Sequence, residues 1–175
     1  VLDAARARFD VTLRDIESVV LSPAELRAAL RDFDAVLPTL GDRFQADVFA
    51  DVPNPRARIL ANFGVGYNHI DAAAARAAGV VVTNTPGAVT DATADVAMTL
   101  MLMTARRAGE GERILRAGAW VGWGPTQMLG MHLTGKTVGI IGMGRIGKAI
   151  ARRCHLGFGM TVLFHNRSAV TDLDL

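Results

Sequence analysis

The residues whose spacing most clearly suggests chemistry form a glycine-rich turn, Gly142–Gly147. The turn reads G-x-G-x-x-G, with an apolar strand pattern before it and an amphipathic helix pattern after it. Gly142 permits a tight turn, Gly144 lets the backbone approach a pyrophosphate, and Gly147 lets the helix pack closely on the strand. The spacing predicts a dinucleotide site in which the helix N-terminus, at Arg145 and Ile146, faces the pyrophosphate. The alternative is a glycine-rich turn that binds no ligand.

The segment after the next strand bears on which dinucleotide is bound. An NAD site usually carries Asp or Glu there, about 20 residues beyond the turn, to hold the ribose hydroxyls. This chain has His165-Asn166-Arg167-Ser168 instead, and no carboxylate follows before Asp172. Arg167, with Asn166 and Ser168 as neutral hydrogen-bonding neighbours, suits a 2′-phosphate. We therefore expect NADP, with NAD less favoured; the alternative is that Arg167 is a solvated loop residue.

A second glycine-rich segment, Gly64-Val65-Gly66, follows an apolar strand pattern in the first half of the chain. Glycines after a strand free the N–H groups of Val65 and Gly66 from ladder pairing, and neighbouring N–H groups bind anions as a nest. We expect this segment to hold a substrate carboxylate. We also expect a positive φ at Gly66, which a β-branched residue would not adopt. The alternative is a plain glycine turn after a buried strand.

The remaining polar residues show no catalytic arrangement. Each histidine lies apart from any carboxylate at a useful spacing, so structural roles are expected for His69, His132, His155 and His165. Asp95 lies in a long helical pattern, where a solvated or capping role is expected. Cys154 lies in the helical pattern after the glycine turn and has no partner that would favour a thiolate. No group of Cys and His residues has the spacing of a zinc site.

Composition limits the classes of function. The 175 residues are 50% hydrophobic and 21% charged with a net charge of +2, which is the balance of a folded globular protein. The absence of a basic run argues against a nucleic-acid binder. No apolar stretch reaches the roughly 18 residues that would span a membrane. The single cysteine excludes an internal disulfide and fits a reducing compartment, so we expect a cytoplasmic protein.

Hydrophobic periodicity alternates strands with helices, which predicts a parallel α/β sheet. Ser22-Pro23-Ala24-Glu25 has the residues of a capping box, and Asp71 caps an Ala-rich helix that Gly79 ends. The segment Trp120–Leu133 is expected to be an extended arm. Methionines of the long helical pattern, Met98, Met101 and Met103, are expected in its core face. Expected strands span 9–13, 34–37, 58–63, 80–83, 137–141 and 160–164. Expected helices span the chain start, 22–31, 44–49, 71–79, 90–107, 109–117 and 145–154.

Three motifs occur in order along nearly the whole chain. They are Phe63–Asp71 (FGVGYNHID), Asn84–Asp95 (NTPGAVTDATAD) and Leu133–Gly147 (LTGKTVGIIGMGRIG). Together they resemble the D-isomer-specific 2-hydroxyacid dehydrogenases, where similar segments form the substrate loop, the crossover into a long interdomain helix and the cofactor turn. Within that family the chain is most similar to glyoxylate and hydroxypyruvate reductases, which share the Asn-Arg-Ser type of cofactor segment.

The resemblance implies an α/β protein with two parts. Residues 1–88 would form a flavodoxin-like substrate domain that lacks its first strand. Residues 89–175 would form the interdomain helix and the first part of a Rossmann (doubly wound) NAD(P)-binding domain. It implies hydride transfer between NADP(H) and a small 2-keto acid, with Thr93 near the nicotinamide and the catalytic Arg, Glu and His beyond Leu175. It also implies a homodimer, which the apolar arm Trp120–Leu133 supports.

Two other classes of protein stay open at this point. The same architecture serves in corepressor-like interaction proteins that sense a dinucleotide, because a fold does not fix a function. Neither end of the sequence resembles a domain terminus, which leaves an inactive fragment as the other alternative.

Overall fold

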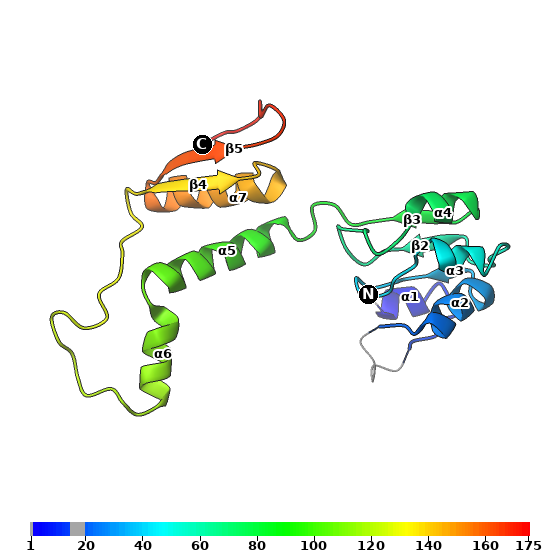
Figure 1. Cartoon of the computed structure of the whole chain (residues 1–175), viewed down its shortest axis with the longest axis horizontal. Helices are drawn as coiled ribbons and strands as arrows, with labels where there is room; N and C mark the ends of the chain where they lie inside the picture. The colour runs from blue at the N-terminus through cyan, green and yellow to red at the C-terminus, as the bar shows by residue number, and fades with distance from the viewer. Residues whose placement is uncertain (1, 15–19) are drawn as a thin grey trace. The chain divides into compact units, whose positions relative to one another are not determined.

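The chain consists of two compact units, each built from helices and parallel strands. The computed structural model describes residues 2–14 and 20–175. Unit 1 ends at Pro86 and unit 2 extends from Gly87 to Leu175. Every strand pair in both units is parallel (Figure 1), which confirms the predicted α/β class.

Unit 1 carries a three-stranded parallel sheet in the order β1-β2-β3. Leu60 in the central strand pairs with Val36 on one side and Val82 on the other. Helices connect the strands, as expected for parallel neighbours. The elements are α1 (Leu2–Arg6), α2 (Pro23–Asp32), β1 (Ala35–Val36), α3 (Ala46–Ala50), β2 (Ile59–Ala61), α4 (Ala72–Ala77) and β3 (Val81–Thr83).

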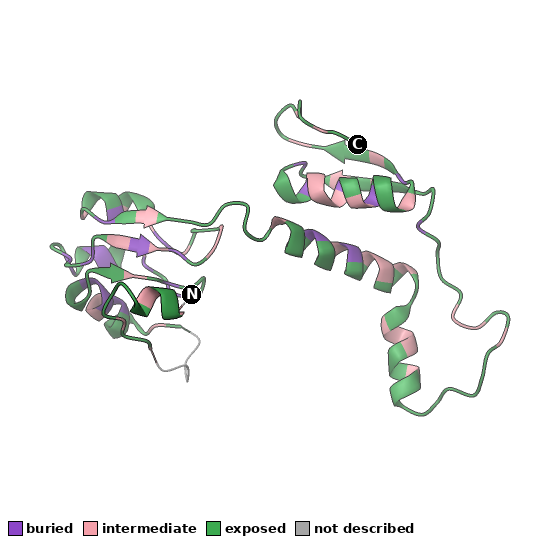
Figure 2. Cartoon of the chain, turned by 180° about the vertical axis from the view of Figure 1, so that it is seen from behind, coloured by how far each residue is buried: buried purple, intermediate pink, exposed green. Residues whose placement is uncertain are grey.

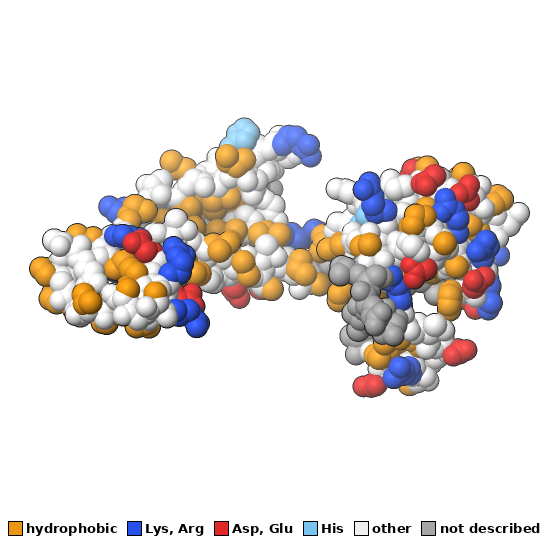
Figure 3. Space-filling view, turned by 60° about the horizontal axis from the view of Figure 1, so that its bottom comes forward, with side chains coloured by type: hydrophobic (Ala, Val, Ile, Leu, Met, Phe, Trp, Pro, Cys, Tyr) orange, Lys and Arg blue, Asp and Glu red, His pale blue; other side chains and the backbone are white. Residues whose placement is uncertain are grey.

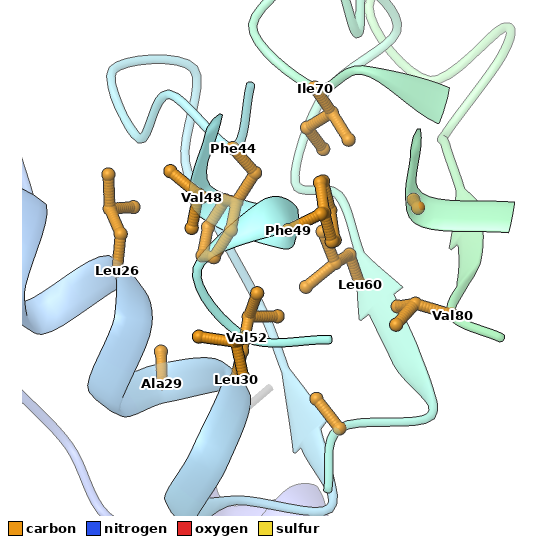
Figure 4. Close-up of a cluster of buried hydrophobic side chains, with 12 residues drawn as sticks. Leu26, Ala29, Leu30, Phe44, Val48, Phe49, Val52, Leu60, Ile70 and Val80 are labelled. Atoms are coloured by element: carbon orange, nitrogen blue, oxygen red, sulfur yellow. The ribbon is translucent and has the colours of Figure 1, made fainter. Parts of the chain in front are cut away.

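The core of unit 1 lies between the central strand and the helices. Leu30, Phe44 and Leu60 are completely buried, and side chains of α2, α3 and β2 meet there (Figure 4). Burying a large apolar side chain contributes about 1.5–3 kcal/mol. This packing fixes the end of β2, from which the glycine segment 64–66 departs.

Two helix starts in unit 1 follow the sequence prediction. The Ser22 side chain accepts from the Glu25 N–H, and the Glu25 carboxylate accepts from the Ser22 N–H at 2.7 Å, which completes the capping box. Hydrogen bonding to Ser22 lowers the pKa of Glu25. Asp71 accepts the N–H groups of Ala73 and Ala74 at the start of α4. Gly79 follows that helix with a φ of +77°.

Unit 2 places a two-stranded parallel sheet on one side of a helix and a longer helix on the other. In Figure 1, α7 lies between the sheet and α5. Figure 2 shows buried positions on α5 and α7, whereas α6 has none. The elements are α5 (Thr90–Ala105), α6 (Ala108–Arg116), β4 (Thr137–Ile141), α7 (Arg145–Arg152), a π-helical turn η1 (Arg153–Gly157) and β5 (Thr161–His165).

The core of unit 2 is small and contains sulfur. Met98 of α5 and Cys154 of η1 are buried, with their sulfur atoms 3.6 Å apart, and they pack with Leu133 and Met160. Burial raises the pKa of the Cys154 thiol, which keeps the thiol protonated as the sequence suggested.

Two expectations from the sequence are wrong in detail, and a third needs one addition. Residues 9–13 form no strand, although their apolar and polar residues alternate. Phe9 and Leu13 are exposed, so the apolar positions of this pattern do not pack into the core. Of the α5 methionines, Met98 is buried and Met101 packs partly buried against the same core, as expected, whereas Met103 is exposed. Asp95 is exposed, as expected for a solvated side chain, and its carboxylate also accepts from Arg153 at 2.8 Å.

The surface carries mixed charges. On the face shown in Figure 3, Lys and Arg side chains are interspersed with Asp and Glu. Within residues 2–14 and 20–175, no helix combines the length and apolar character needed to cross a membrane.

Candidate cofactor and substrate sites

The glycine turn of unit 2 has the geometry that its spacing predicts. Gly142, directly after β4, has a φ of +97° and donates its N–H to the His165 carbonyl of β5 at 2.8 Å. A Cβ at Gly147 would collide with the carbonyl oxygen of Gly142, so only glycine lets α7 lie this close to the strand. A Cβ at Gly144 would meet nothing, because that position faces open space. The turn therefore leaves room where a phosphate could approach the backbone.

The N-terminus of α7 opens onto the same turn. Gly144 is the N-cap residue and supplies no side-chain acceptor to the helix. The first N–H groups of a helix lack intrahelical partners, and the helix dipole makes this end electropositive. Arg145 and Ile146, the first two residues of α7, thus present N–H groups that fit a pyrophosphate.

In the segment after β5, one polar side chain binds the glycine turn and two others are exposed to solvent. The Asn166 side chain accepts the Met143 N–H at 3.1 Å and donates to the Ser168 carbonyl at 2.8 Å. Asn166 therefore holds the turn rather than pointing freely at a ribose. Arg167 and Ser168 are exposed, and within the described ranges neither side chain has a hydrogen-bond or ion-pair partner. A guanidinium and a hydroxyl are thus available beside the turn.

The first carboxylate after β5 is engaged with α7. Asp172, the first acidic residue after the strand, pairs with Lys148 of α7. Hydrogen bonding from Lys148 lowers the pKa of Asp172, so this carboxylate stays charged and engaged with the helix. The sequence could locate Asp172 but not its partner, which lies 24 residues away in the chain.

Thr93 is not brought to the turn by any hydrogen bond within the described residues. It lies in the first turn of α5 with an exposed side chain. Its backbone N–H donates to Val89, as an ordinary helical residue does.

In the described part of unit 1, the carbonyls of the segment 64–66 accept hydrogen bonds and two of its N–H groups have no acceptor. The Gly64 carbonyl accepts from Thr85 N at 3.0 Å and from Asn62 Nδ2 at 3.2 Å. The Val65 carbonyl accepts from Asn84 Nδ2 at 2.9 Å. Within residues 2–14 and 20–175, no acceptor takes the N–H of Val65 or of Gly66. The segment thus offers adjacent donors suited to a carboxylate.

The expected positive φ at Gly66 is wrong. Gly66 is not among the glycines with positive φ, and a Cβ there would meet nothing within 4 Å. The physical reason is that hydrogen bonds from Asn62 and Asn84 orient the segment, so a left-handed backbone is not needed. Gly64 is the tighter position, because a Cβ there would approach Leu40 Cδ2 to 2.6 Å.

Sequence reasoning missed the residues that hold this segment. Asn62 is 2% exposed at the end of β2, and its Oδ1 lies 3.0 Å from Nε2 of His69. A polar residue at the end of a buried apolar strand was the available signal. An open hollow of about 500 Å³ lies beside the segment, lined by Leu40, Gly41, Arg43, Gly66, Asn68 and His69.

Comparison with known proteins gives a consistent result. The model of the D-isomer specific 2-hydroxyacid dehydrogenase catalytic domain matches residues 2–172. A glyoxylate reductase of Thermococcus gammatolerans is 44% identical over 172 residues, which are 95% of this chain and 50% of that protein. A second one, from Thermococcus kodakarensis, is 48% identical over 79% of this chain and 42% of its own length.

A solved structure supports the same relationship. An NADPH-dependent glyoxylate/hydroxypyruvate reductase of Sinorhizobium meliloti superposes with a TM-score of 0.71 at 37% identity, covering 87% of this chain and 47% of that one. The chain spans about half the length of the curated relatives it matches.

Proposed function

The chain belongs to the D-isomer-specific 2-hydroxyacid dehydrogenase family, and from that premise we propose that the full-length protein transfers hydride between NADP(H) and a small 2-keto or 2-hydroxy acid. Glyoxylate and hydroxypyruvate are the proposed keto acids, because relatives of 44–48% identity are named glyoxylate reductase and one of 37% identity is named glyoxylate/hydroxypyruvate reductase. The names of these relatives do not favour a corepressor-like role.

The observation that carries the proposal is the glycine turn on β4. Its three glycines have a positive φ, an open face and a close helix contact in the order that pyrophosphate binding requires. We assign the pyrophosphate to Gly142, Gly144 and Gly147 with the N–H groups of Arg145 and Ile146. A bound nicotinamide cofactor supplies the hydride; the protein binds, orients and protonates.

The proposal prefers NADP to NAD. It is supported by the exposed Arg167 and Ser168 after β5, and by the pairing of Asp172 with Lys148. A guanidinium can donate two charge-assisted hydrogen bonds to a phosphate, whereas a carboxylate would repel it. Asn166 contributes by bracing the turn through the Met143 N–H. Thr93 on α5 remains a proposed contact of the nicotinamide.

The proposed carboxylate site is the segment Gly64-Val65-Gly66. Its support is that the Val65 and Gly66 N–H groups have no acceptor within the described ranges, while the carbonyls of the segment are occupied. A carboxylate that accepts two backbone N–H groups compensates both donors. The proposal includes a homodimer and a cytoplasmic location, the latter supported by one buried, protonated cysteine, Cys154.

The test is the steady-state oxidation of NADPH by the full-length protein with glyoxylate and with hydroxypyruvate, each repeated with NADH. We expect turnover with both keto acids and a higher kcat/KM with NADPH. Turnover with NADH alone would contradict the cofactor assignment. The absence of oxidation with any small 2-keto acid would contradict the proposed reaction.

A further inference from the structure

Among the residues that the structure describes, two side-chain amides and one backbone N–H hold the carbonyls of the segment 64–66. Asn62 Nδ2 donates to the Gly64 carbonyl at 3.2 Å and to the Gly66 carbonyl at 3.0 Å. Asn84 Nδ2 donates to the Val65 carbonyl between them at 2.9 Å. Asn62 follows β2 and Asn84 follows β3, so both amides stand at the same end of the parallel sheet.

These bonds determine where the N–H groups of the segment point. In a trans peptide the C=O of one residue and the N–H of the next point in opposite directions in one plane, and within the described residues no peptide is cis. Because the carbonyls of Gly64 and Gly66 both point at Asn62, the N–H groups of Val65 and Tyr67 point away from it. The Gly66 N–H likewise points away from Asn84.

The Asn62 amide is itself fixed in orientation. Its nitrogen faces two carbonyl oxygens, so it must be the donor end, and its Oδ1 must accept from Nε2 of His69 at 3.0 Å. A flipped amide would place oxygen against two carbonyl oxygens. The Asn62 backbone N–H is bound to Thr83 of β3 at 3.1 Å. Sheet, amide and imidazole thus form one continuous hydrogen-bonded support, which we call the amide clasp (Asn62, His69 and Asn84).

We propose that the amide clasp positions the substrate carboxylate, with Asn62 and Asn84 aiming the N–H groups of Val65 and Gly66 and His69 locking Asn62. This inference rests on the proposed function. It adds the Tyr67 N–H as a further donor, because this group points away from Asn62 as the Val65 N–H does. The clasp residues touch the backbone of the segment and not the substrate, so they are positioning residues.

The decisive variant is Asn62→Asp, which keeps the side-chain shape and removes the donor end. A carboxylate oxygen would then face the Gly64 and Gly66 carbonyls, and the peptides of the segment would turn. In the full-length protein we expect the KM for hydroxypyruvate to rise about tenfold or more. We expect a smaller change in kcat and no change in the Kd of NADPH.

Three further variants and a matched control guard against a folding defect. Asn84→Asp removes the other amide donor and should also raise the KM. His69→Gln retains a donor for Asn62 and should keep a near-normal KM, whereas His69→Leu should not. The matched control is Leu30→Ala, which opens the core of the same unit far from the segment in sequence; it should lower Tm and leave the KM unchanged.

The outcomes separate this inference from the function on which it rests. If the wild-type protein reduces keto acids but Asn62→Asp and Asn84→Asp keep its KM, the inference is wrong and the function stands. The inference is also wrong if His69→Gln and His69→Leu have equal effects, or if Leu30→Ala raises the KM as much as the clasp variants. If the wild-type protein reduces no keto acid, the proposed function is wrong and the inference fails with it.

Discussion

At the scale of single residues, Arg167 is the group on which the cofactor assignment depends most. It follows β5 with an exposed side chain, and no acidic residue of the described ranges pairs with it. Four other arginines of unit 2 form ion pairs, as Arg153 does with Asp91 and Asp95. An unpaired guanidinium beside the glycine turn is available to a phosphate.

We expect Arg167→Ala to weaken NADPH binding selectively. A hydrogen bond to a charged group contributes about 1.5–3 kcal/mol, which corresponds to a roughly 10- to 150-fold rise in Kd. Exposure to solvent and salt places the result at the lower end of that range. Fluorescence titration of both cofactors measures it, with Arg116→Ala on α6 as the control. A similar loss for NADH, or no loss for NADPH, would contradict the assignment.

Some local geometry could be predicted from the sequence and some could not. The positive φ of Gly142, the open face of Gly144 and the close helix contact of Gly147 are as expected from local sterics, and their role in binding a pyrophosphate stays a prediction. The expectation for Gly66 was wrong because its conformation depends on amides whose positions only the folded chain defines. Asn62 binds residues two to seven positions away; the sequence shows a polar residue after an apolar strand pattern, but not which groups that residue binds.

At the scale of elements, contact between α7 and β4 depends on Gly147. We expect Gly147→Ala to push the helix away from the Gly142 carbonyl and to cost about 1–3 kcal/mol of folding free energy, as overpacking does. NADPH binding should weaken as well, because the same shift displaces the phosphate-binding N–H groups. Denaturant unfolding and cofactor titration measure the two effects.

Gly139→Ala is the matched control for that helix variant. Gly139 lies in β4, and a Cβ there would meet nothing within 4 Å. We therefore expect Gly139→Ala to cause little change in the free energy of unfolding or in the Kd of NADPH. Equal effects of the two substitutions would show that the close helix–strand contact is not what Gly147 provides.

Elements with strong local signals were predicted well. The capping box set the start of α2, and β4 spans the expected residues. The strand prediction for residues 9–13 was wrong, because an alternating pattern forms a strand only where a neighbouring strand can pair with it. The buried face of α5 also depended on tertiary contact, since apolar residues occur around most of that helix.

At the scale of the whole molecule, unit 2 exposes apolar surface that supports the proposed homodimer. In the arm 120–133, Val121 is 95% exposed and Trp123 is 82% exposed. Contiguous exposed apolar residues indicate an interaction surface. We expect light scattering of the full-length protein at micromolar concentration to give a dimeric mass, and Trp123→Ser with Val121→Ser to shift it toward monomer. A monomeric wild type would contradict the homodimer.

The measurement that tests the central claim most directly compares hydroxypyruvate with dihydroxyacetone in the full-length protein with NADPH. The two compounds differ only by a carboxylate in place of a hydroxymethyl group. Two hydrogen bonds to a charged group contribute about 1.5–3 kcal/mol each, so we predict a kcat/KM about a hundredfold or more higher for hydroxypyruvate. Equal kcat/KM for the two compounds, or no NADPH oxidation with hydroxypyruvate, would contradict the account.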